Sequence, residues 1–136
     1  MPGRLSFGTD GVRGRALTEL TPEYVRALGA AAGEVLGAGR WLIGRDTRES
    51  GPVLEAALIA GLRAAGATPE SVGVVPTPAL AHLSAVLDVP AAMITASHNP
   101  FDDNGVKVFA PGGVKLTDAV ERQIEAALVV DGPDHG

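Results

Sequence analysis

Residues 41–75 read WLIGRDTRESGPVLEAALIAGLRAAGATPESVGVV, and this stretch indicates the fold class. Short apolar runs of β character stand at its two ends, at residues 41–43 and 72–75. Between them, Gly51 and Pro52 open a segment whose leucines at 54, 58 and 62 line one face of a helix. A strand, a helix and a strand in this order predict a βαβ unit, in which the two strands run parallel.

The same alternation continues on both sides of this unit. Helices are expected at about residues 21–36, 77–87 and 117–128, where Thr21, Thr77 and Thr117 can serve as N-caps. Further strands are expected at residues 91–95 and 106–109, which are short apolar runs between turn residues. We therefore predict an α/β protein with helices on both faces of its sheet.

The length of the chain sets the expected domain organisation. A chain of 136 residues fits one domain, and we assign residues 1–130 to a three-layer α/β/α domain. Its sheet is expected to be mostly parallel but mixed, with about four strands. Residues 131–136 read as the start of a linker to further domains that this chain lacks.

Charge and cysteine content exclude several functions. The 11 Lys and Arg against 16 Asp and Glu give a net charge of −5, which disfavours nucleic acid as the main partner. The chain has no cysteine, which excludes disulfides, thiolate catalysis and cysteine-ligated zinc. Apolar runs stay well short of the roughly 20 residues that span a bilayer, and the N-terminus lacks the apolar core of a signal peptide. We expect a soluble, cytoplasmic protein.

The strongest candidate for chemistry is residues 95–107, TASHNPFDDNGVK. A buried strand leads to Ser97, whose hydroxyl would be presented in a tight polar turn beside the donors of His98 and Asn99. Lys107 follows after a turn that we expect at Asn104-Gly105. A hydroxyl, several donors and an ammonium group suit a phosphoryl group. The alternative, which stays open, is a polar hairpin whose Ser and Asn side chains satisfy the turn backbone.

A hydrolase nucleophile or a calcium loop fits this segment less well. The chain has no G-x-S-x-G nucleophile elbow, which disfavours an α/β-hydrolase. An EF-hand alignment on Gly105 puts Pro100 and Pro111 at the terminal ligand positions, so a calcium loop is excluded. A Ser-His-Asp triad stays possible, but no acid is singled out to orient a histidine.

Two glycine-rich segments could also bind an anion. The glycines of residues 7–14, FGTDGVRG, would allow a ligand to approach the backbone closely, and Arg13 could bind its phosphate. The alternative is that this segment forms only an irregular turn. Residues 44–51, GRDTRESG, place Arg45 ahead of a helix N-terminus, which attracts phosphate. For this second segment we favour a scaffold role, in which its arginines pair with its own carboxylates and fix the loop.

Taken together and in order, FGTDGVRG, GRDTRESG and TASHNPFDDNGVK resemble the N-terminal domain of the α-D-phosphohexomutases, over about residues 4–128. Within that family, FGTDGVRG and Asn-Gly-Val-Lys are most similar to members that interconvert glucosamine 6-phosphate and glucosamine 1-phosphate. Members that act on glucose or mannose phosphates, the alternative, more often have Tyr where this chain has Val106.

The resemblance implies a role for each matching residue. Ser97 would carry a phosphoryl group, give it to the sugar phosphate to form a bisphosphate, and take the other phosphoryl group back. His98, Lys107 and Arg13 match residues beside that group, and Asn99 and Arg45 would contact substrate or phosphate. The family binds Mg²⁺ at the phosphoserine, and an oxygen of Ser97 would be its one ligand from this chain. A sugar bisphosphate would serve as activator.

The resemblance covers only the first of the family's four domains. The Asp-rich metal loop, the sugar-selecting loop and the distal phosphate-binding loop of domains II–IV have no counterpart here. We therefore expect the 136-residue chain to be inactive by itself. Two other hypotheses stay open: a non-catalytic phosphate-binding or interaction module and, more distantly, a serine hydrolase.

Overall fold

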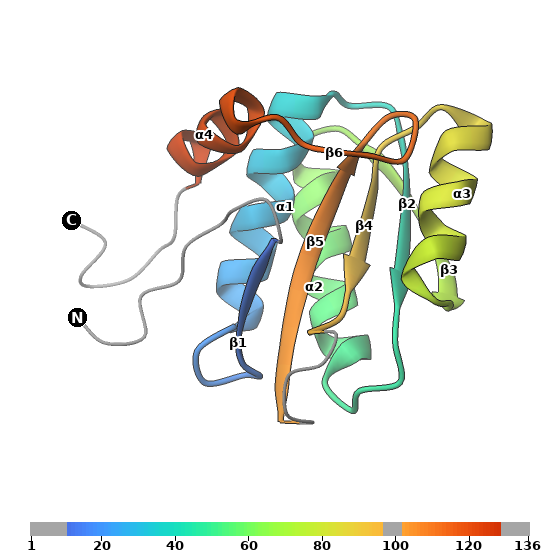
Figure 1. Cartoon of the computed structure of the whole chain (residues 1–136). Coiled ribbons are helices and arrows are strands. Elements are labelled where there is room, and N and C mark those ends of the chain that lie inside the picture. Colours follow the sequence, from blue (N-terminus) through green and yellow to red (C-terminus); the bar gives the residue numbers. More distant parts are fainter. Residues whose placement is uncertain (1–10, 97–101, 129–136) are drawn as a thin grey trace.

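The computed structural model describes residues 11–96 and 102–128. In this part of the chain, one sheet of six strands has the order β1-β5-β4-β2-β3, with β6 paired to β5 (Figure 1). The strands are β1 (Val12–Arg15), β2 (Arg40–Arg45), β3 (Thr68–Val74), β4 (Ala91–Ile94), β5 (Asp103–Ala110) and β6 (Val114–Lys115). The helices are α1 (Pro22–Leu36), α2 (Gly51–Ala64), α3 (Thr77–Leu87) and α4 (Asp118–Ala127).

The strand pairings confirm a mixed sheet with a parallel core. β2 lies between β3 and β4 and pairs with both in parallel, as the βαβ pattern predicts. β5 pairs antiparallel with β4, β1 and β6, so parallel pairing is confined to one half of the sheet. β1 and β6 were not predicted from the sequence, because strands of four and two residues carry too little alternation to be recognised.

The helices form two layers of unequal size around the sheet (Figure 1). α1, α2 and α4 cover one face, and the larger core lies between them and side chains such as Trp41, Ile43 and Ile94. α3 covers β2 and β4 on the other face, over a smaller core that includes Leu42, Met93 and Phe109. The three-layer α/β/α architecture is therefore confirmed.

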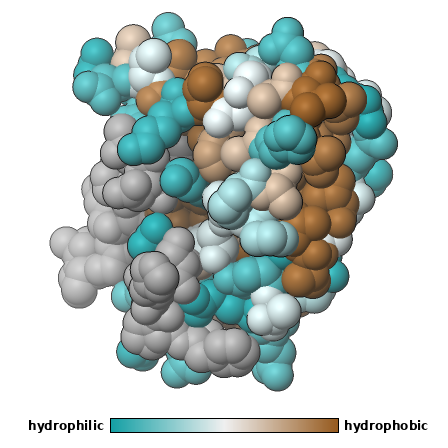
Figure 2. Space-filling view, turned by 45° about the vertical axis from the view of Figure 1, so that its right-hand side comes forward, coloured by the Kyte–Doolittle hydropathy of each residue, from teal (hydrophilic) through white to brown (hydrophobic). Residues whose placement is uncertain are grey.

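The outer surface of α3 is largely apolar, with His82 as its exposed polar side chain. This helix carries no Asp, Glu, Lys or Arg, and Val86 and Leu87 at its end are 64% and 40% exposed. Brown surface accordingly dominates the right-hand part of Figure 2, the side on which α3 lies. α3 is therefore only partly buried by this domain. None of the helices in the described ranges is long and apolar enough to cross a membrane.

Two of the three expected threonine caps are confirmed. The side chains of Thr21 and Thr117 accept hydrogen bonds from the backbone N–H groups of Tyr24 and Val120, three residues into their helices. The third prediction is wrong by one residue. Thr77 is already helical, and the carbonyl of Pro76 accepts the first N–H groups without a side-chain cap.

The turn expected at Asn104-Gly105 is also wrong, because both residues lie inside β5. A Cβ on Gly105 would lie 2.6 Å from the Val12 carbonyl oxygen and 2.7 Å from that of Thr95. Glycine is required here by the close approach of the two neighbouring strands rather than by turn geometry. The Asn-Gly pair is typical of hairpin turns, and only the packing around it identifies it as part of a strand.

Tyr24 gives a first prediction. Its side chain is 8% exposed, and its hydroxyl has no hydrogen-bond partner among the described residues. Burial and, secondarily, the Glu125 carboxylate raise the pKa of Tyr24. Because the unfolded chain releases this proton above about pH 10 while the folded chain keeps it, stability falls as the pH rises past that point.

Tyr24→Phe should remove that alkaline loss. At pH 7 it should leave stability unchanged or raise it by up to about 1 kcal/mol, because a buried hydroxyl without a partner costs free energy. Urea unfolding of both proteins between pH 7 and 11 measures both effects. A clear loss of stability at pH 7 would show instead that the hydroxyl is bonded in solution.

Candidate functional site

Three polar segments meet at one edge of the sheet. β2 and β4 are parallel neighbours, so their carboxyl ends lie side by side and lead into residues 46–50 and 95–96. β5 runs the opposite way beside β4, which brings its first residues, 103–105, to the same edge. Binding loops of open α/β sheets lie beyond the carboxyl ends of the parallel strands. This edge is therefore the candidate site.

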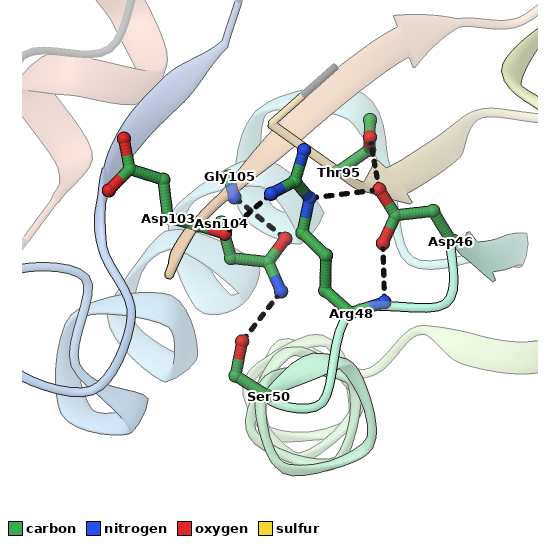
Figure 3. A network of polar contacts seen from close by, with 7 residues as sticks. All are labelled: Asp46, Arg48, Ser50, Thr95, Asp103, Asn104 and Gly105. Carbon is green, nitrogen blue, oxygen red and sulfur yellow. Dashed lines mark hydrogen bonds and ion pairs between the residues drawn. The ribbon is translucent and has the colours of Figure 1, made fainter. Parts of the chain in front are cut away.

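An Asp–Arg pair joins the three segments (Figure 3). Oδ2 of Asp46 accepts hydrogen bonds from Thr95 Oγ1 at 2.6 Å and from Arg48 Nε at 3.1 Å. Its other oxygen accepts the backbone N–H of Arg48 at 3.1 Å. Arg48 is 7% exposed and donates from Nη1 to the carbonyl oxygen of Asp103 at 3.2 Å. We refer to Asp46, Arg48, Thr95 and Asp103 as the Asp46 network.

A second set of hydrogen bonds joins the start of β5 to the residue that precedes α2. Asn104 is fully buried, and its Nδ2 donates to Ser50 Oγ at 2.8 Å. Its Oδ1 accepts the backbone N–H of Gly105 at 2.9 Å (Figure 3). Because Ser50 directly precedes α2, this bond fixes the first turn of that helix against β5.

The central candidates Ser97, His98 and Asn99 lie outside the described residues. The residues before them are held by hydrogen bonding and burial. Thr95 donates its backbone N–H to the Gly105 carbonyl at 2.9 Å, and Ala96 is fully buried. The site therefore consists of a defined frame around residues 97–101.

Arg13 and Lys107 lie on neighbouring strands of this frame. Val12 and Val106 are paired and buried in the core under α1 and α2, so by alternation Arg13 and Lys107 lie on the opposite sheet face. The Arg13 side chain packs over Gly105, with its Cγ 2.9 Å from where a Cβ on Gly105 would lie. Gly105 pairs with Thr95, and this places Arg13 close to the strand end that leads to Ser97.

Lys107 has another contact in this structure. Its Nζ lies 5.4 Å from the centre of the Phe109 ring, a distance typical of a cation–π contact. Phe109 pairs with Ala91 at the beginning of β4, so the ammonium group points away from the end that leads to Ser97. In this structure the Lys107 ammonium group therefore lies on the Phe109 side of its strand.

Arg45 is paired with a carboxylate. Its Nη1 forms an ion pair with Glu55 of α2, and Glu55 also accepts a hydrogen bond from the Ser71 hydroxyl. The Arg48–Asp46 pair lies within the same 44–51 segment. These contacts are the scaffold arrangement favoured from the sequence, with the difference that Arg45 pairs with the helix rather than with its own loop.

A shallow hollow opens beside the frame. It is lined by Arg15, Ala16, Leu17, Glu49, Ser50, Val53 and Asp102. One arginine stands there against two carboxylates, so the hollow by itself does not favour a phosphate.

The side chains of the described residues do not form a metal site. No group of three or more His, Asp or Glu side chains in the described ranges could hold one. Mg²⁺ requires near-octahedral oxygen ligation, and the Asp46 carboxylate is already occupied by three donors. No chemical step is therefore derived through a metal bound to these residues.

Asp46, Thr95 and Asn104 were not singled out from the sequence as parts of the site. A usable signal was present in Asp46 and Arg48, which stand two residues apart after a strand, the spacing of an Asx turn. The burial of Asn104 had no such signal. What these contacts can do is to hold the backbone in place on either side of residues 97–101.

The chain is similar to known proteins in sequence and in fold. The family model described as phosphoglucomutase/phosphomannomutase, alpha/beta/alpha domain I, matches residues 4–130. The chain is 55% identical over 136 residues to a phosphoglucosamine mutase of Nocardia farcinica, and the match covers 96% of this chain and 30% of that protein. It is 57% identical over 138 residues to a phosphoglucosamine mutase of Mycobacterium leprae, covering 96% of this chain and 29% of that protein.

Two solved structures have a similar fold. A putative phosphomannomutase from Thermus thermophilus superposes with a TM-score of 0.85 at 34% identity, covering 95% of this chain and 31% of that one. A phosphoglucomutase/phosphomannomutase family protein from Burkholderia thailandensis gives a TM-score of 0.75 at 32% identity, covering 91% and 31%. The chain thus spans about 30% of the length of the curated relatives it matches.

Proposed function

The chain belongs to the phosphoglucomutase/phosphomannomutase family as its α/β/α domain I, and on that premise we propose that it is the phosphoserine-bearing domain of a phosphosugar mutase. The reaction would interconvert glucosamine 6-phosphate and glucosamine 1-phosphate. The observation that supports this most strongly is the arrangement of the described residues on either side of residues 97–101. In the sequence Ser97 comes three residues after the buried strand β4, and the Asp46 network contacts Thr95 before this segment and Asp103 after it.

The proposed reaction has two transfers. The phosphoryl group on Ser97 Oγ passes to the free hydroxyl of the bound sugar phosphate, which gives a sugar bisphosphate and leaves Ser97 unmodified. After the bisphosphate reorients, its other phosphoryl group passes back to Ser97 Oγ. The phosphate has then moved between O6 and O1, and the enzyme is restored. Such transfers depend mainly on positioning and on charge stabilisation around the moving group.

The remaining candidates supply that environment. Arg13 packs over Gly105, close to the strand that leads to Ser97, and in this proposal its guanidinium would pair with phosphoryl oxygens. Lys107 and His98 would neutralise and donate to the transferring group, and Asn99 would contact substrate or phosphate. Arg45 would reach a phosphate only by leaving Glu55.

A complete enzyme requires more than this chain. Mg²⁺ would take an oxygen of Ser97 as one ligand and would draw the others from a further domain, because the described residues provide no cluster for it. Partner domains II–IV, a sugar bisphosphate as activator and a cytoplasmic location belong to the same proposal. The 136-residue chain is expected to show no turnover alone.

The proposed function is tested by measuring whether Ser97 carries phosphate. Intact full-length protein from its native source, digested and analysed by mass spectrometry, should carry phosphate on the Ser97 peptide, localised to Ser97. A serine that stays unmodified even after incubation with glucosamine 1,6-bisphosphate would favour a non-catalytic module. Rates of the full-length protein with glucosamine, glucose and mannose phosphates then decide the sugar. The names of the two relatives above favour glucosamine.

A further inference from the structure

The segment that leaves β2 contacts both chain ends beside residues 97–101. On the incoming side, Asp46 accepts the Thr95 hydroxyl at 2.6 Å and donates its own backbone N–H to the Ile94 carbonyl at 3.1 Å. On the outgoing side, Arg48 donates to the Asp103 carbonyl at 3.2 Å. One short segment thus sets the positions of both ends.

The Asp46 network is held by several hydrogen bonds, and two of its members, Arg48 and Thr95, are buried. The Asp46 carboxylate accepts three hydrogen bonds, two of them from Arg48. Arg48 is 7% exposed and Thr95 is 8% exposed, whereas the Asp46 side chain is 29% exposed, so the donors are shielded from water more than the carboxylate that accepts from them. Charge-assisted bonds in such surroundings are strong and hold a single arrangement.

The outgoing contact is made to backbone. Because Arg48 bonds the Asp103 carbonyl, it fixes the path of the main chain rather than one side-chain rotamer. The neighbouring bond from Asn104 to Ser50 holds the same strand against the start of α2. The distance between the backbone at Thr95 and the backbone at Asp103 therefore depends on Asp46 and Arg48.

We propose that Asp46 and Arg48 are positioning residues for Ser97, acting through Thr95 and the Asp103 backbone. The proposal rests on the proposed function of Ser97 as the phosphoryl carrier. In-line phosphoryl transfer requires the serine oxygen to be held in register with the attacking hydroxyl, and displacement by about 1 Å can cost on the order of 100-fold in rate. Substrate binding should depend on the Asp46 network less than turnover does, because none of its four members is among the residues proposed to contact substrate.

The experiment uses the full-length protein and the variants Thr95→Val, Thr95→Ser, Asp46→Asn and Arg48→Lys. Thr95→Val removes the hydroxyl that Asp46 accepts, and Thr95→Ser keeps it. Arg48→Lys keeps the charge but has no fork to reach Asp46 and Asp103 together. We expect kcat to fall about 10- to 100-fold in Thr95→Val, Asp46→Asn and Arg48→Lys, with KM for glucosamine 6-phosphate changed less than about 3-fold. Thr95→Ser should restore kcat to within about 3-fold of the parent.

A double variant tests whether Asp46 acts through Thr95. If it does, Thr95→Val combined with Asp46→Asn should lower kcat no further than the worse single variant. Losses that multiply would overturn this coupling.

Ser84→Ala is the matched control for stability. Ser84 is also fully buried and makes two hydrogen bonds, to the Val89 carbonyl and from the Gly113 N–H, but it lies before the amino end of β4, at the opposite edge of the sheet. Its kcat should equal that of the parent even where its thermal midpoint falls as far as that of Thr95→Val. An equal loss of kcat in Ser84→Ala would overturn the positioning role.

Failure of this proposal can be told apart from failure of the proposed function. If Ser97 carries phosphate but the three disruptive variants turn over at the parental kcat, only the positioning role is wrong. If Ser97 is never phosphorylated, the proposed function is wrong, whatever the variants do.

Discussion

Ser97→Ala in the full-length protein should abolish sugar-phosphate turnover, with a loss on the order of 10⁶-fold or to below detection. The reason is chemical, because alanine offers no oxygen to carry the phosphoryl group between the two transfers. Binding of the sugar phosphate should persist, since the side chains that would contact it are unchanged. Coupled measurement of glucosamine 1-phosphate formation, together with calorimetric titration of glucosamine 6-phosphate, separates the two effects.

Thr18→Ala is the matched control for this loss. It also removes one hydroxyl, from an exposed turn between β1 and α1 where no side-chain hydrogen bond is made to it among the described residues. Its turnover should equal that of the parent. Full activity in Ser97→Ala would leave the Ser97 loop without a catalytic role and would favour the non-catalytic module.

Gly61→Ala should destabilise the domain by about 3 kcal/mol or more, although the same change in an exposed helix stabilises by about 1 kcal/mol. A Cβ on Gly61 would lie 2.0 Å from the Arg26 carbonyl oxygen and 2.9 Å from the Ala30 nitrogen, both backbone atoms of α1. Gly29 of α1 approaches the Leu58 carbonyl in the same way, at 2.6 Å. The two helices must therefore move apart, and the core that they share with the sheet loosens.

Urea unfolding of the parent and the variant measures this loss. Gly39→Ala is the control, because a Cβ at Gly39 meets nothing within 4 Å and this residue has no left-handed φ. Its stability should stay within about 0.5 kcal/mol of the parent. Equal stability of Gly61→Ala and Gly39→Ala would show that the backbones of α1 and α2 are not in close contact.

The proposed function gives the domain a limited share of the active site. Its described residues would supply the contacts on either side of residues 97–101 and the guanidinium of Arg13, and among them there is no cluster of metal ligands. The curated relatives are more than three times as long as the chain. The remaining groups needed for the reaction would come from other domains of such a protein.

The sequence by itself determined the elements with strong local signals. The leucines of α2 and the caps at Thr21 and Thr117 placed helices correctly, because helix periodicity and capping depend on residues within a few positions of one another. The order of strands and helices likewise predicted the α/β/α class. The Ser97 loop was identified by its residue types and family resemblance, not by geometry.

The tertiary structure alone decided the features that depend on contacts between distant segments. Asn104-Gly105 belongs to a strand because of close approach by the strands of Val12 and Thr95. Asp46 contacts Thr95 and Arg48 contacts Asp103, on either side of residues 97–101, because parallel pairing of β2 and β4 brings their carboxyl ends together. Residues 49 positions apart, such as Asp46 and Thr95, leave no local pattern, so only the packed sheet could show that they meet.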